Sequence, residues 1–157
     1  MDEMEMKKEL ANRMNISRIL WGAMFGSVCI YLALGYALPR MGGFKLPPYP
    51  PPDVVAYALI AVGAASAGTG VLIALGALPF PKISQGEPPA AVIQKVFSFM
   101  IVSWALCETA ALLGLALFFL GGSFNYLFTL SIIAVGGLAI AFPKEEKYTE
   151  ALKKAGA

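Results

Sequence analysis

Hydrophobic residues in this chain are gathered into four long runs, which polar or proline-rich segments separate. The runs cover about residues 16–38, 54–78, 91–120 and 124–142. An α-helix needs about 20 residues to cross a hydrocarbon core of about 30 Å. The pattern therefore predicts an all-α, polytopic membrane fold with four transmembrane helices, in a single membrane domain over residues 1–157.

The segments between the runs indicate how the helices are connected. Residues 39–53 hold a dense group of prolines, so we expect a rigid surface loop there or, alternatively, a recognition segment. Pro79 and Pro81 are expected to end the second helix. Residues 121–123 leave room only for an antiparallel hairpin, and the polar tail over residues 143–157 allows a short solvated helix.

The first run could also be a cleavable signal peptide. Its apolar stretch is longer than the roughly 7 to 15 residues of a signal sequence, so we expect a retained membrane span. The charged segment that precedes residue 16 allows a short separate helix.

The composition agrees with a membrane protein. The 157 residues are 58% hydrophobic and 14% charged, which is more apolar surface than a soluble domain of this length could bury. The chain has no histidine, and Cys29 and Cys107 fall inside apolar runs, where a thiol behaves as a small hydrophobe. We therefore expect no metal site, no cofactor, no nucleic-acid partner and no enzymatic activity, since no nucleophile and base are paired.

The distribution of cations predicts the orientation. Ten of the 12 Lys and Arg residues lie in the N-terminal segment, near the connection between the second and third runs, or in the tail. Only Arg40 and Lys45 lie on the other side. By the positive-inside rule, we expect both termini in the cytoplasm and the chain in the cell membrane.

Small residues recur at helical spacing and predict close contact between helices. Helices in lipid gain little from the hydrophobic effect when they meet, so association depends on small residues that let backbones approach. The positions expected to pack are Gly22 and Gly26 in the first run, and Gly63, Ala67, Gly70 and Ala74 in the second. They indicate either a compact four-helix bundle or contacts between copies of the chain.

Glu108 is the only acidic residue inside any run, and it lies near the middle of the third. A charged carboxylate at that depth costs about 3 kcal/mol on insertion scales, so the neutral form is favoured unless water or a cation reaches it. One interpretation is that Glu108 binds and releases a proton. The other is that it forms a structural hydrogen bond to Ser66, Thr69, Ser131 or a backbone carbonyl.

Residues 61–70, AVGAASAGTG, and 105–115, ALCETAALLGL, resemble the helical hairpin of the rotary ATPase proteolipids, the c or K subunits. The resemblance covers about residues 61–120. It implies a first helix that packs against its copies and a second that presents Glu108 as an ion-carrying carboxylate, with Thr109 in support. Sodium-type members carry a glutamine or second carboxylate on the first helix, which the second run here lacks, so the resemblance implies a proton.

Together these observations predict a proteolipid-like membrane subunit with a proton-binding carboxylate, acting in an oligomer or a larger membrane complex. The expected partners are the lipid bilayer and either copies of the chain or other membrane subunits. The alternative is an accessory or scaffold subunit in which Glu108 has a structural role.

Overall fold

The computed structural model describes residues 3–41, 47, 50–78, 83–121 and 123–156. Within them the regular elements are all helical: α1 (Glu3–Ala37), η1 (Leu38–Arg40), α2 (Asp53–Ala74), α3 (Pro89–Phe119), α4 (Phe124–Ile140) and α5 (Glu145–Ala155). The all-α prediction is confirmed. Parts of the expected proline-rich loop, and Pro79 and Pro81, lie outside the described residues.

Three of these helices are long and apolar enough to cross a membrane, namely α1, α2 and α3. The count rises to 4 if α4 and α5, which are bent by 52° relative to each other, are taken as one span. These helices are compatible with a membrane protein, as the hydrophobic runs predict.

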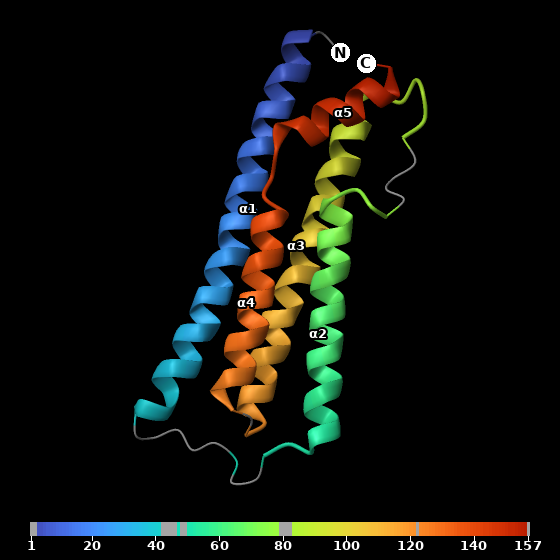
Figure 1. Ribbon diagram of the computed structural model, residues 1–157. Coiled ribbons are helices and arrows are strands. Elements are labelled where there is room, and N and C mark those ends of the chain that lie inside the picture. Colours follow the sequence, from blue (N-terminus) through green and yellow to red (C-terminus); the bar gives the residue numbers. More distant parts are fainter. Residues whose placement is uncertain (1–2, 42–46, 48–49, 79–82, 122, 157) are drawn as a thin grey trace.

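Helices α1 to α4 run alternately up and down along one another, with α3 in contact with all the others. Figure 1 shows α1 and α2 on opposite sides of α3 and α4, and α5 lying across one end of the bundle. The start of α1, the end of α2 and the start of α3 lie at that same end. The segments of the chain that carry most cations are therefore brought together.

Helix α1 is longer than the sequence pattern suggested. It runs without a break from Glu3 to Ala37, so the charged N-terminal segment and the first apolar run form one helix. The segment before Gly22 contains neither glycine nor proline, and its Glu, Lys, Met and Leu residues favour a helix, so nothing separates the two parts.

Helix α2 ends at Ala74, four residues before the end of the predicted run. Gly76 adopts a φ of 70°, which an L side chain disfavours, and its amide bonds the Ile73 carbonyl at 3.0 Å. The glycine thus ends the helix before the prolines that were expected to end it. At the start of α4, Ser123 caps the Asn125 amide at 3.2 Å.

The small residues of α2 are buried against α3 and α4. A Cβ added at Gly70 would lie 2.6 Å from the Ser103 carbonyl oxygen, and one at Gly63 would lie 3.4 Å from the Ala110 Cα. Ala67 is also buried, and Ala74 is partly buried. These residues therefore let the two helices approach within the chain, as in a compact bundle.

Gly22 and Gly26 on α1 behave differently. A Cβ added at either one would meet nothing within 4 Å, so neither packs against another helix in the described part of the chain. The close glycine contact of α1 lies further along, at Gly35, which meets Leu127 of α4. The described contacts thus do not support a role of Gly22 and Gly26 in packing the bundle, and the alternative, contacts between copies of the chain, stays a prediction.

Candidate functional site

Glu108 lies in the middle of α3 and faces α1, where it is partly buried. Its Oε1 atom is hydrogen-bonded by the hydroxyls of Ser27, in a short contact, and of Tyr31, at 3.0 Å. Ser27 and Tyr31 are four residues apart, so they project from the same side of α1. One carboxyl oxygen thus joins α1 to α3 at mid-helix.

Ser27 also lies 2.7 Å from the backbone carbonyl of Met24, one turn earlier in α1. A serine hydroxyl has a single proton to donate, so it can bond either Met24 or Glu108 at one time. If the proton points to Met24, the close contact of Ser27 with Glu108 requires a proton on the carboxyl. If the carboxyl is ionised, Ser27 donates to it instead.

The arrangement therefore offers hydrogen bonds to both protonation states of Glu108. The Tyr31 hydroxyl can donate to Oε1 in either case, because a protonated carboxyl oxygen retains acceptor capacity. Between the two states the Ser27 hydroxyl would rotate about its own bond. A buried polar group that stays satisfied in two states can change its protonation without breaking the packing around it.

Other polar side chains of α3 bond backbone carbonyls of neighbouring helices. The Ser103 hydroxyl donates to the Gly70 carbonyl at 2.7 Å, and the Trp104 indole donates to the Ala141 carbonyl at 2.8 Å. They link α3 to α2 and to the end of α4. Glu108 is the carboxylic acid residue of α3, and its described hydrogen bonds go to side chains of α1 instead.

The residues expected to partner Glu108 do not do so. Thr69 donates to the Ala65 carbonyl at 2.9 Å, and Thr109 donates to the Ala105 carbonyl at 2.8 Å. The described hydrogen bonds do not join Ser66 or Ser131 to Glu108, and the buried Ser131 hydroxyl has no partner within the described chain. The physical reason is rotation, since α2 packs on the side of α3 that carries Ser103 and Cys107, whereas Glu108 points to α1.

Ser27 and Tyr31 were missed because they are 81 and 77 residues from Glu108 in the chain. A signal for them exists in the sequence, since Ser27 lies at the midpoint of the run over residues 16–38 and Glu108 lies near the midpoint of its own run. Polar residues at the same depth in different spans are natural partners, because each otherwise faces hydrocarbon.

Two more side-chain bonds hold α1 in place. The Trp21 indole donates to the Leu138 carbonyl of α4 at 2.8 Å, and Ser17 and Tyr148 of α5 share a buried bond of 3.0 Å. Burial raises the pKa of Tyr148, more than the bond to Ser17 lowers it, so its hydroxyl stays protonated and available for this bond. Helix α1 is thus linked by polar contacts to α3, α4 and α5 in turn.

The described residues hold no group of three or more His, Cys, Asp or Glu side chains that could bind a metal ion. Fold and site together define a helical protein with apolar candidate membrane helices and one hydrogen-bonded carboxyl at mid-helix. Comparison with family models, curated proteins and solved structures finds no match to this chain. The function is therefore inferred from the residues around Glu108.

Proposed function

We propose that the chain is an integral membrane subunit in which Glu108 binds and releases a proton, acting within an oligomer or a larger membrane complex. It would span the cell membrane four times, with both termini in the cytoplasm. Helix α4 has 17 residues, or about 25 Å of helix, and its extension through Phe142 brings it close to the thickness of the hydrocarbon core. The end of the bundle that gathers the cation-rich segments would face the cytoplasm.

The observation that supports the proton chemistry is the shared proton of Ser27. Ser27 contacts both the Glu108 carboxyl and the Met24 carbonyl, and it can donate to only one of them. Either choice leaves the carboxyl hydrogen-bonded, so gain and loss of a proton are both accommodated at this depth. An ionisable group inside a span is functional more often than not, since a cheaper residue could fill a purely structural place.

The similarity to the rotary ATPase proteolipids supports the same chemistry, with one difference in assembly. In that family the glycine-rich first helix packs against its copies. Here the corresponding face of α2 is covered by α3 and α4 of the same chain, with Gly63 and Gly70 buried. Copies of this protein would therefore meet through another face.

The test is infrared difference spectroscopy of the protein in lipid, recorded as a function of pH. We expect a protonated-carboxyl C=O band that titrates in the wild type and is lost in Glu108→Gln. Glu150→Gln, which changes an exposed carboxyl of α5, is the matched control and should leave the band in place. A hydrophobic carbodiimide should label Glu108 in a pH-dependent manner. If the band does not titrate and Glu108 resists labelling at every pH, the proton-binding role must be abandoned.

A second candidate function is that of an accessory or scaffold subunit. It is favoured by the observation that Glu108 takes part in the polar contacts that attach α1 to the other helices, alongside those of Trp21 and Ser17. Glu108→Gln keeps a carbonyl oxygen as acceptor, so a scaffold should tolerate it fully. The number of copies in the native assembly also separates the two functions, since many identical copies favour the rotor-like role and one copy among unlike subunits favours the scaffold.

A further inference from the structure

Helix α5 is tied to the connection between α2 and α3 at two places. The Lys147 ammonium donates to the Ala74 carbonyl at the end of α2, at 2.5 Å, and the Gly86 amide donates to the Ala155 carbonyl at 3.0 Å. Tyr148 and Leu152 of α5 are buried against the bundle. These two hydrogen bonds hold α5 across the end of the bundle. The space between the two bonds is not filled by side chains.

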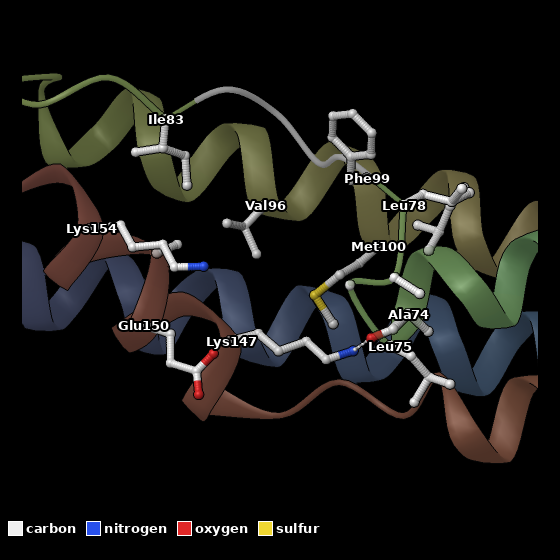
Figure 2. A pocket seen from close by; sticks show the side chains of 14 residues that line it. Ala74, Leu75, Leu78, Ile83, Val96, Phe99, Met100, Lys147, Glu150 and Lys154 are labelled. Atoms are coloured by element: carbon white, nitrogen blue, oxygen red, sulfur yellow. Dashed lines mark hydrogen bonds between the residues drawn. The ribbon is translucent and has the colours of Figure 1, made fainter.

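A cavity of about 690 Å³ lies between these two ties, bounded by α5, the end of α2 and the first turns of α3. This volume falls in the range of about 300–1,000 Å³ that is typical of sites for small molecules. Its lining is apolar on the side of α2 and α3, with Leu75, Leu78, Ile83, Val96, Phe99 and Met100. Figure 2 shows Ile83, Val96 and Met100 across the cavity from Lys147 and Lys154.

The α5 side of the cavity is polar and has an excess of positive charge. Lys147, Glu150 and Lys154 line it, and no described ion pair involves any of the three. Lys147 is half-buried, and burial followed by the charge of Lys144 lowers its pKa. Both effects disfavour the ammonium ion, and an anion in the cavity would oppose both.

The position of the cavity along the bundle fits an amphiphile. It lies where the apolar runs end and the charged segments begin, which in a membrane-spanning chain is the level of the lipid headgroups. A soluble anion would satisfy the lysines but leave the apolar wall uncovered. A neutral lipid would cover the wall but leave two ammonium groups against one carboxylate.

We propose that this cavity binds an anionic phospholipid, with the phosphate between Lys147 and Lys154 and an acyl chain along Leu78, Val96 and Met100. The inference rests on the membrane placement of the chain and not on the proton chemistry of Glu108. It would couple α5 to the composition of the cytoplasmic leaflet, because the same lysine that binds the phosphate also caps α2.

The test is native mass spectrometry of the purified protein titrated with phosphatidylglycerol or phosphatidylcholine. We compare Lys147→Gln/Lys154→Gln with Lys144→Gln/Lys153→Gln, which removes the same charge from residues that do not line the cavity. The first double variant should bind phosphatidylglycerol about 25-fold more weakly, at about five-fold for each lysine, and the control should stay near the wild type. Lys154→Gln against Lys153→Gln repeats the comparison without touching the Lys147 contact with α2.

Three results would overturn the proposal. Equal loss of affinity in both double variants would mean that only the surface charge of α5 matters. Equal affinity for the two lipids would remove the role of the lysines. Complete displacement of the lipid by inorganic phosphate would show that a soluble anion is the ligand.

Ala77→Phe, which places a large side chain in the cavity lining, should weaken lipid binding while leaving the titration of Glu108 unchanged. If Glu108 does not titrate in the wild-type protein while phosphatidylglycerol still binds, only the proposed function is overturned.

Discussion

Cys107 lies between two glycines of different helices, and this arrangement predicts a specific pattern of stability changes. A Cβ at Gly70 of α2 would lie 2.6 Å from the Ser103 carbonyl oxygen and 2.8 Å from the Cys107 sulfur. A Cβ at Gly137 of α4 would lie 2.8 Å from the same sulfur, with its next contacts at 3.4 Å. Gly70→Ala therefore collides with backbone and sulfur, whereas Gly137→Ala collides with the sulfur alone.

The magnitude follows from two opposing effects. Overpacking a close contact costs about 1–3 kcal/mol, and exchanging glycine for alanine inside a helix gains about 1 kcal/mol. Gly68→Ala in α2 and Gly136→Ala in α4 gain the same helix propensity and meet nothing within 4 Å. The difference in unfolding free energy between each pair therefore isolates the steric cost, which we expect to be about 1–3 kcal/mol.

Cys107→Ala removes the sulfur and separates the two sites further. Combined with Gly137→Ala it should recover most of the steric cost, a coupling of about 1 kcal/mol or more in a double-mutant cycle. Combined with Gly70→Ala it should recover little, because the Ser103 carbonyl oxygen remains. The assay is reversible unfolding in mixed micelles, followed by helical circular dichroism. If Gly70→Ala and Gly68→Ala unfold alike, or if Cys107→Ala rescues both glycine variants equally, the packing of α2 and α4 on α3 is wrong.

The remaining predictions concern the polar contacts. Tyr148→Phe removes the buried bond to Ser17 and should loosen α5 by about 1 kcal/mol, seen as faster hydrogen exchange in α5. Ser27→Ala and Tyr31→Phe should each change the wavenumber of the Glu108 C=O band, because both hydroxyls bond this carboxyl. Ser103→Ala should not, because the Ser103 hydroxyl bonds α2. The bond from Lys95 lowers the pKa of Glu87 below its usual 4.5, so its contribution to stability is present above that pH and is lost as the pH falls through the lowered value. Glu87→Gln should therefore expose the start of α3 to exchange at neutral pH and match the wild type in acid.

The helices could be predicted from the sequence because their length is set by long apolar runs, but two of their ends could not. Helix α2 ends at Ala74 because Gly76 takes a positive φ. The presence of a glycine in an apolar run does not by itself predict that conformation. Helix α1 extends back to Glu3 because hydrophobic patterning does not register a charged helix that continues an apolar one. Both differences arise from local backbone preferences rather than from hydrophobicity.

Glu108 could be identified from the sequence because a lone acid in an apolar run is costly, but its partners depend on helix rotation. Each residue of a helix is turned by about 100° from the one before. Cys107 faces α2 and α4, so Glu108, the next residue, points elsewhere. Ser66 and Thr69 come from the run that precedes α3 in the chain, and nearness in sequence made them the obvious candidates.

Helix α1 is attached to the bundle by a different kind of contact from α2. Small buried residues bring α2 against α3, whereas α1 is joined through the side chains of Ser17, Trp21 and Ser27 at three successive depths, with one close glycine at Gly35. In lipid such bonds contribute about 0.6 kcal/mol each on average, and they act alongside the packing of the buried Met14 and Val28 of α1. The bond at Glu108 is the one of the three whose pattern changes with a proton. A proton-binding subunit would exchange a proton at this bond, while a scaffold would use the same bond only to hold α1, and Glu108→Gln keeps the second property while removing the first.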